Sequence, residues 1–332
     1  MNIVIYLGKN YEWKRGSFMK LITFTHNGFK RIGALEDSKV IDLNAAFKAK
    51  LQSEGKLRAS QIASAFIPAD DMNGFLQGGE ESMNFAKEAI IFALENESAV
   101  SLVFEKDDVK LEAPVPAPGK MICVGHNYRE HILEMKREIP SIPVVFAKFA
   151  NTVIGPEDEI PFYPISNELD YEAEFAFVIG KRARNVSQEK ALDYVSGYTI
   201  VNDVTYRDIL RRTLQWLQGK TVDGTAPMGP WLITADELTD PTGLEIVLSV
   251  NGEERQRSNT ANLVFSVQYL VEFLSNLMTL EPGDVILTGT PGGVGVALQP
   301  PVFLKDGDVV RIEVEQVGVL ENQVKHVNGV LV

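Results

Sequence analysis

Apolar and polar residues alternate along residues 20–43 of the chain. Such alternation is typical of strands that bury one face, and short polar or glycine-containing pairs mark the turns between them. Two pairs of this kind interrupt the pattern, Asn27-Gly28 and Asp37-Ser38. The segment therefore predicts two or three short antiparallel strands.

A helical period replaces this alternation over residues 44–66 and again over residues 82–97. In the second stretch the apolar residues recur at helical spacing, at Phe85, Ala89, Ile90 and Ala93. Residues spaced in this way share one face of an α-helix. We expect two helices here, which together with the strands make a small α+β domain over residues 19–111.

A proline-rich connector over residues 112–119 contains Pro114, Pro116 and Pro118. Because proline has no backbone N–H to donate, this stretch favours an extended linker and marks a domain boundary. Residues 120–332 then contain short β-branched runs and few long helical patterns. The chain is thus predicted to be α+β and β-rich, with its larger domain after the linker. The runs are MICVG, VVFAK, AEFAFVIG, YTIVND, LEIVLSV, DVILTG and DVVRIEVEQV.

Charge and composition exclude several kinds of partner. The 332 residues carry a formal net charge of −13, from 32 lysines and arginines against 45 aspartates and glutamates. This field repels polyanions, so we expect no nucleic acid. The single cysteine, Cys123, and four histidines do not provide a thiolate zinc site. No apolar run approaches the roughly 18 residues that span a bilayer, so we expect no membrane partner.

Residues 1–18 contain an apolar run that is too short for the core of a signal peptide. We therefore expect a cytoplasmic protein. A natural start at Met19 would make residues 1–18 an upstream extension.

Glu172 and Glu174 stand in the strand-like run LDYEAEFAFVIG. Side chains alternate faces along a strand, so these two carboxylates point the same way. Two adjacent carboxylates need either water or a cation, and their oxygens suit a hard ion such as Mg²⁺, Mn²⁺ or Ca²⁺. The residues alone leave two interpretations open, a metal site and a solvent-exposed strand edge.

Asp203 ends the apolar run GYTIVND. A carboxylate at the end of a buried strand is held rigidly, so Asp203 is a candidate third ligand beside the two glutamates. It is equally a candidate N-cap for a helix that begins near Val204.

His131 and Glu134 are three residues apart in GHNYREHILEMKREIP. If residues 128–137 are helical, the two side chains share a face, and the carboxylate then orients the imidazole as a general base. An ordinary surface pair is the alternative. We assign no role to His126 in the same motif.

Lys148 and Lys220 follow apolar or glycine-containing stretches, where a lysine is able to hold a carboxylate or an enolate. Solvated surface lysines are the alternative. The run TGTPGGVG lacks the features of a phosphate-binding loop or a dinucleotide fingerprint. Its backbone amides and Thr290 remain candidates for binding a carboxylate.

Six motifs in this order resemble the fumarylacetoacetate hydrolase family, and especially its acylpyruvases, oxaloacetate decarboxylases and homoprotocatechuate-pathway isomerase/decarboxylases. The resemblance covers residues 120 to 324 and implies a mixed β-sandwich-like roll and a homodimer. The motifs are GHNYREHILEM, FAK, LDYEAEFAFVIG, GYTIVNDVTYRD, GKTVDGTAPMGP and LTGTPGGVG.

The resemblance also implies the roles of single residues. The divalent-metal ligands would be Glu172, Glu174 and Asp203. His131 and Glu134 would be the water-activating dyad and Lys220 the partner of the enolate or keto oxygen. The substrate contacts would be Lys148, Thr290 and Arg207.

Two residues depart from the family pattern beside the Arg-Asp pair. Tyr206 stands where the family often has alanine, and Leu210 stands where it commonly has glutamine. We expect both near the pocket, where they would make its wall bulkier or less polar.

The expected function is metal-dependent C–C cleavage of a β-keto or β-diketo acid of the acylpyruvate or fumarylpyruvate type. Water attacks the distal carbonyl, and the pyruvate enolate that leaves is stabilised by the metal and Lys220. Decarboxylation of oxaloacetate or a related 2-oxo diacid and isomerisation of 2-hydroxyhepta-2,4-diene-1,7-dioate use the same electron sink, so both stay open. A non-catalytic regulatory protein on the same scaffold is the remaining alternative. The expected partner is a small anionic 2-oxo acid.

Overall fold

The computed structural model describes residues 19–327. The first three strands are β1 (Lys20–His26), β2 (Phe29–Glu36) and β3 (Lys39–Asp42), each antiparallel to the next. Asn27 and Gly28 make the first turn with positive φ angles of 50° and 79°. The predicted antiparallel strands of residues 20–43 are confirmed. The proposed extension, residues 1–18, lies outside the described residues.

Four helices follow these strands, α1 (Leu43–Ser53), α2 (Leu57–Gln61), α3 (Met72–Gln77) and α4 (Gly79–Glu95). Asp42 caps α1 by accepting a hydrogen bond from the backbone N–H of Ala45 at 2.9 Å. The helix expected over residues 44–66 is two helices, because Gly55 adopts a left-handed φ of +73° after α1 and ends it. The helix expected over residues 82–97 is α4.

The strands on both sides of the proline-rich connector share one large sheet. β1 pairs with β14, which lies more than 200 positions later, and the strand order is β4-β3-β2-β1-β14-β12-β11-β17-β6-β7. β5 adds to β1 and β8 adds to β14. The bounds are β4 (Val103–Glu105), β5 (Lys110–Glu112), β6 (Met121–Gly125), β7 (Val144–Lys148), β8 (Val153–Ile154), β11 (Ala173–Ile179), β12 (Val195–Asn202), β14 (Ala226–Thr234) and β17 (Val285–Leu287).

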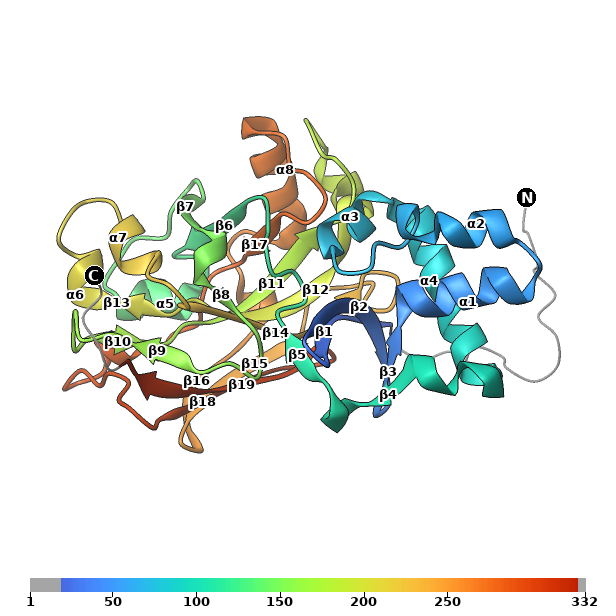
Figure 1. Cartoon of the computed structure of the whole chain (residues 1–332). Coiled ribbons are helices and arrows are strands. Elements are labelled where there is room, and N and C mark those ends of the chain that lie inside the picture. Colours follow the sequence, from blue (N-terminus) through green and yellow to red (C-terminus); the bar gives the residue numbers. More distant parts are fainter. Residues whose placement is uncertain (1–18, 328–332) are drawn as a thin grey trace.

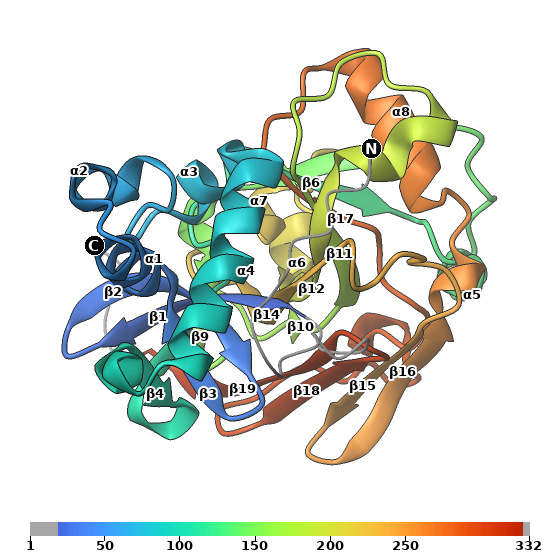
Figure 2. The ribbon, with the colours of Figure 1, turned by 90° about the vertical axis from the view of Figure 1, so that its right-hand side faces the viewer.

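A second sheet has the order β16-β15-β18-β19-β9. Its strands are β9 (Ile160–Phe162), β15 (Glu245–Val250), β16 (Glu253–Asn259), β18 (Val309–Val314) and β19 (Gly318–His326). Figure 1 shows α1 and α2 at one end of the molecule and the short helices α6 and α7 at the other, and Figure 2 gives the view from the α1 end. The α+β, β-rich prediction with its β-sandwich-like roll is confirmed.

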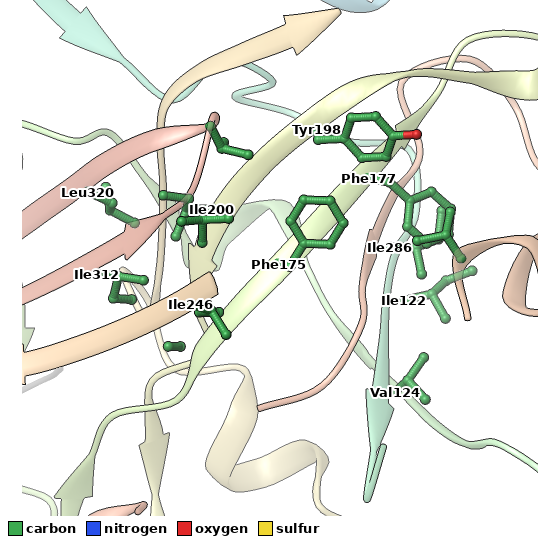
Figure 3. Close-up of a cluster of buried hydrophobic side chains, with 14 of the residues drawn as sticks. Ile122, Val124, Phe175, Phe177, Tyr198, Ile200, Ile246, Ile286, Ile312 and Leu320 are labelled. Carbon is green, nitrogen blue, oxygen red and sulfur yellow. The ribbon is translucent and has the colours of Figure 1, made fainter. Parts of the chain in front are cut away.

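The central strand β11 is buried on both faces. Phe175 and Phe177 join the core that Ile246, Ile312 and Leu320 of the second sheet complete (Figure 3). Ala176 and Val178 point the other way, into a core shared with the N-terminal helices. Alternation along one strand therefore fills two hydrophobic layers.

The remaining elements are short except for α8 (Val267–Leu277), which the sequence prediction missed. The pair β10 (Leu169–Asp170) and β13 (Thr205–Tyr206) is antiparallel. Among the described residues, no helix is long and apolar enough to cross a membrane. The other helices are α5 (Arg129–Glu134), α6 (Arg207–Leu210), α7 (Leu217–Lys220), and the 3-10 segments Ala63–Ala65, Glu97–Leu102, Lys106–Asp108, Ala150–Thr152, Gln188–Tyr194, Thr260–Asn262 and Gly295–Ala297.

Candidate metal centre and active site

Antiparallel pairing brings the three predicted carboxylate ligands together. The register pairs Ala173 of β11 with Asn202 of β12, so Glu172 lies beside Asp203, whose N–H donates to the Glu172 carbonyl at 2.9 Å. One oxygen of each of Glu172, Glu174 and Asp203 lies within 4.8 Å of the others. All three side chains are buried, and strand β13 rather than a helix follows Asp203. The exposed-edge and N-cap alternatives are therefore wrong.

Two buried lysines balance this negative charge. Lys220 Nζ lies 2.6 Å from both Glu172 Oε2 and Asp203 Oδ2. Lys148 Nζ lies 3.0 Å from Asp203 Oδ1 and donates to the Val204 carbonyl at 3.2 Å. Both lysines are almost fully buried, so the surface-lysine alternative is wrong for each. Lys220 lines the cavity described below, whereas Lys148 lies behind Asp203, and this geometry gives no support to its predicted substrate contact.

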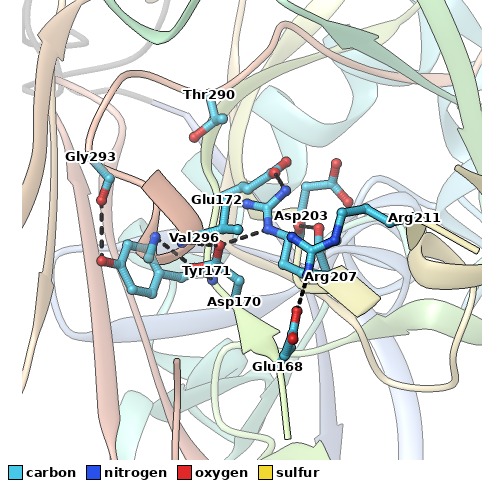
Figure 4. Close-up of polar contacts among 12 residues, drawn as sticks. Glu168, Asp170, Tyr171, Glu172, Asp203, Arg207, Arg211, Thr290, Gly293 and Val296 are labelled. Atoms are coloured by element: carbon cyan, nitrogen blue, oxygen red, sulfur yellow. Dashed lines mark hydrogen bonds and ion pairs between the residues drawn. The ribbon is translucent and has the colours of Figure 1, made fainter. Parts of the chain in front are cut away.

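Arg207 joins Glu172, a candidate metal ligand, to another buried carboxylate, Asp170 (Figure 4). Its Nε lies 2.7 Å from Asp170 Oδ2 and its Nη1 lies 2.6 Å from Glu172 Oε1. Asp170 also accepts hydrogen bonds from the backbone N–H groups of Gly295 and Val296. The guanidinium that we expected to contact substrate thus bridges two carboxylates. Among residues 19–327, its Nη2 has no hydrogen-bond partner.

Burial and charge shift the pKa values at this site in opposite directions. Burial tends to raise the pKa of Glu172, but Lys220 and Arg207 outweigh it and hold the pKa at about 2. Burial, with Asp203 and Glu172 nearby, raises the pKa of Glu174 well above its usual value. Burial lowers the pKa of Lys148, whereas Asp203 and Glu172 overcome burial and raise the pKa of Lys220.

The donor set fits a hard divalent cation. It consists of carboxylate oxygens from Glu172, Glu174 and Asp203, with no thiolate or imidazole among them. Glu174 Oε2 is oriented by the N–H of Gly289, which donates to it at 2.6 Å. Asp203 Oδ1 is buried, with Lys148 Nζ 3.0 Å away. A buried carboxylate that lies beside two others is a position that a cation stabilises.

His131 and Glu134 of α5 form the predicted pair. His131 Nδ1 lies 2.8 Å from Glu134 Oε1, and Glu134 Oε2 accepts a hydrogen bond from the N–H of Gly293 at 2.8 Å. His131 is 7% exposed, which excludes an ordinary surface pair. Because the carboxylate accepts from Nδ1–H, Nε2 is the nitrogen free to take a proton. The catalytic role of the pair stays a prediction.

These groups border a cavity of about 630 Å³. His131, Glu172, Glu174, Arg207, Lys220 and Thr290 all line it. The Thr290 hydroxyl accepts a hydrogen bond from Gln256 Nε2 at 2.8 Å, so its orientation is fixed. Leu210 lines the cavity as expected. Tyr206 does not line the cavity, because its hydroxyl points away and accepts a hydrogen bond from the backbone N–H of Tyr163.

Three further residues of the cavity wall were missed by the sequence reasoning: His126, Arg137 and Trp216. The ring of His126 stacks on His131 at 6.0 Å between centroids and meets Trp216 edge-on at 5.4 Å. His126 and Arg137 flank the predicted dyad in the sequence, and that proximity was the available signal. Trp216 precedes α7, and nothing local in the sequence marks it.

A curated relative extends over most of the chain. The mitochondrial oxaloacetate tautomerase of Xenopus laevis is 44% identical over 255 residues, which cover 76% of this chain and 78% of that protein. Relatives from Homo sapiens and Bos taurus are also named mitochondrial oxaloacetate tautomerases.

The names of these relatives contradict the cytoplasmic location that we expected. The expectation is wrong in its reasoning too, because a signal-peptide core is the mark of secretion, whereas mitochondrial import uses amphipathic, arginine-rich segments. The short apolar run in residues 1–18 therefore carries no information about that compartment.

Two solved structures have the same fold. A fumarylacetoacetate hydrolase from Exiguobacterium antarcticum matches with a TM-score of 0.75 and 35% identity over 93% of this chain and 100% of its own. Maleylpyruvate hydrolase from Sphingobium sp. SYK-6, solved with manganese(II) and pyruvate, matches with a TM-score of 0.70 and 30% identity over 93% of this chain and 99% of its own. Relatives of this chain are thus enzymes, and one of them binds Mn²⁺.

A family model supports the same assignment. The model for the C-terminal part of fumarylacetoacetate (FAA) hydrolase matches residues 120–325, which include every predicted site residue. Together with the 44% identical relative, this match shows that the chain belongs to the fumarylacetoacetate hydrolase family.

Proposed function

We propose that the protein is a divalent-metal-dependent enzyme that interconverts the keto and enol forms of oxaloacetate or a closely related 2-oxo diacid. The observation that carries the proposal is the buried cluster of Glu172, Glu174 and Asp203, whose two glutamates line a cavity together with Lys220 and His131. The curated tautomerases and the structure with manganese(II) and pyruvate support it. Mg²⁺ and Mn²⁺ are the proposed metals, with Ca²⁺ a weaker fit to a catalytic site.

The three carboxylates would hold the metal, which supplies Lewis-acid stabilisation of negative charge on the oxygens of a 2-oxo acid. Lys220 contributes a second positive charge next to Glu172 and Asp203, where it stabilises an enolate oxygen. Arg207 keeps Glu172 oriented and ionised through its contact at 2.6 Å. With a metal bound, the site would therefore be preorganised for an anion before any substrate enters.

His131 would move the proton. With Nδ1 held by Glu134, its Nε2 is positioned to take a proton from C3 of the keto acid and to give it to the C2 oxygen of the resulting enolate, which yields the enol, and to carry the proton back in ketonisation. Glu134 stabilises the imidazolium that forms, and the N–H of Gly293 keeps Glu134 in place. This exchange needs no water and breaks no C–C bond.

C–C hydrolysis of an acylpyruvate, which we expect from sequence, is the second candidate function. The observation that favours it is the same dyad, since an imidazole paired with a carboxylate also activates water. Decarboxylation and dienol isomerisation share the enolate and stay open. Tautomerisation ranks first because the relative with 44% identity carries that name, whereas the hydrolase structure is 30% identical.

One assay separates these reactions. Oxaloacetate added in its enol form loses its ultraviolet absorbance on ketonisation, and pyruvate release is followed in parallel with lactate dehydrogenase. The proposal predicts fast loss of enol with pyruvate formation at the uncatalysed rate. Enzyme-dependent pyruvate from oxaloacetate would identify a decarboxylase, and pyruvate from an acylpyruvate with no effect on the enol would identify a hydrolase.

A further inference from the structure

Lysine and arginine side chains line the cavity, and most of them are paired with carboxylates. Lys220 is paired with Glu172 and Asp203, and Arg207 with Asp170 and Glu172. Arg211, at the outer wall, is paired with Glu168 (Figure 4).

Arg137 is the exception among these cavity-lining cations. Within residues 19–327, its side chain has no carboxylate partner and no hydrogen bond. Its backbone N–H donates to the Ile132 carbonyl at 2.9 Å, which fixes the backbone just after the end of α5, and its side chain is exposed. The carboxylates that line the cavity, Glu172 and Glu174, belong to the metal cluster, and none is left to neutralise Arg137. An unpaired guanidinium in a ligand cavity is a binding group for an anion.

The charge of Arg137 contributes to the pKa shift of His126. Burial, together with His131 and Arg137, lowers the pKa of His126 to about 4, so its ring is neutral at neutral pH. His126 Nδ1 is buried and has no hydrogen-bond partner in the part of the chain that the structure describes. Its backbone φ of 55° lies in the left-handed region, which is uncommon for histidine and typical of constrained functional positions. A neutral ring offers a hydrogen bond without adding a competing charge.

We propose that Arg137, assisted by His126, binds the second carboxylate of a 2-oxo diacid and makes the enzyme select diacids over monoacids. Glu172, Glu174 and Asp203 would hold the metal, which would supply positive charge for the carboxylate and oxo group at one end of the substrate. The far carboxylate of a four-carbon diacid then meets the guanidinium from the α5 side. This inference rests on the proposed function for the position of the first carboxylate.

Malate and lactate test the inference without turnover. They differ only by the carboxylate in question, and both are unreactive 2-hydroxy acids that bind as their 2-oxo counterparts do. Isothermal titration calorimetry on the Mn²⁺-loaded enzyme should show malate binding at least about tenfold more tightly than lactate, the scale of a charged hydrogen-bond pair. Arg137→Ala should erase this preference while the Kd of lactate stays within about twofold of wild type.

Arg129→Ala is the matched control, because Arg129 of helix α5 is exposed like Arg137, carries the same charge and does not line the cavity. It should leave both dissociation constants unchanged. Arg137→Lys should keep part of the preference. A wild-type enzyme that binds malate and lactate equally, or an Arg137→Ala variant that keeps the preference, would overturn the inference. Failure of the enol assay alone would overturn the proposed function and leave this binding test in force.

Discussion

At the scale of single residues, His131 carries the proposed proton transfer. His131→Ala removes the imidazole and leaves the carboxylate cluster intact, so kcat for enol loss should fall by roughly 100-fold or more, the usual scale for loss of a general base. KM should change little, because the metal and Lys220 hold the substrate. Steady-state measurement of enol absorbance checks both values.

Leu133→Ala is the control for this variant, because Leu133 lies on the same helix and is 66% exposed. It should retain wild-type kcat. If His131→Ala also retained it, His131 would have no part in the reaction.

The residues of the site differ in how visible they are in the sequence. Alternation of side chains at the start of strand β11 and the residue before it predicts Glu172 and Glu174 on one face, and this inference needs no tertiary information. Asp170 lies two positions before Glu172, so the same alternation points its side chain to the same face. The sequence reasoning did not use this signal. The contact of Asp170 with Arg207 depends on the pairing of β10 with β13, which are more than 30 residues apart in the sequence. Local patterns do not specify such a contact.

At the scale of elements, strand β2 ends in a carboxyl with a shifted pKa. Burial raises the pKa of Glu36 to about 7, with Asp37 and Glu237 adding to the shift and Lys20 opposing it. A raised pKa means that the folded protein favours the neutral carboxyl. The stability contributed by Glu36 is thus fully present below the unfolded pKa of 4.5 and is lost as the pH rises through 7.

Glu36→Gln mimics the neutral form and should therefore raise Tm at pH 8 while changing it little at pH 5. Thermal melting followed by circular dichroism at the two pH values measures the difference. Glu157→Gln, at an exposed position, should give no pH-dependent gain. An equal effect of Glu36→Gln at both pH values would show that the carboxyl is ionised throughout.

The sequence pattern predicted helix α4, but it joined α1 and α2 into one helix and missed α8. The apolar residues Val267, Leu270, Val271 and Leu274 of α8 have helical spacing, and Ser266 caps the helix by accepting from the N–H of Tyr269 at 3.3 Å. That signal was present and was overlooked among β-branched runs. The break at Gly55 was likewise visible as a helix-ending glycine. The order of strands in the large sheet was not visible, because it depends on contacts between distant segments.

At the scale of the molecule, the proposed domain boundary at residues 112–119 separates segments that pack together. Leu21 of β1 pairs with Leu232 of β14, and buried residues of α1 and α4 share a core with Met121 and Val178. The boundary itself stays a prediction, as does the homodimer. The structure suggests a specific test of whether the second part folds alone.

A fragment of residues 112–332 should fail to fold cooperatively. Without β1, one edge of β14 loses its partner, and the apolar residues under the N-terminal helices become exposed. We expect poor solubility and no sharp thermal transition by circular dichroism, in contrast to the full chain. A soluble fragment with a cooperative melt and enol activity would establish two independent domains.

Part of the acidic excess of the chain lies at this site. The cationic side chains there are fewer than the acidic ones: Lys148, Lys220 and Arg207 against Asp170, Glu172, Glu174 and Asp203. Within this cluster the carboxylates offset the three cations, so the cluster alone gives a small anion no net attraction. A bound divalent cation reverses this balance and allows an anionic substrate to enter. The proposed function therefore depends on a bound divalent metal.

The most direct measurement of that claim is enol activity during metal removal and return. Protein stripped with EDTA should lose tautomerisation of oxaloacetate, and added Mn²⁺ should restore it in wild type. Glu174→Gln should lower Mn²⁺ affinity by more than about 100-fold, since loss of an outer-shell partner alone costs roughly 10–100-fold. It should keep the wild-type melting temperature, because Glu174 has the Gly289 N–H as its partner and no cation that would be left unpaired. Full activity in metal-free wild-type protein would contradict the account.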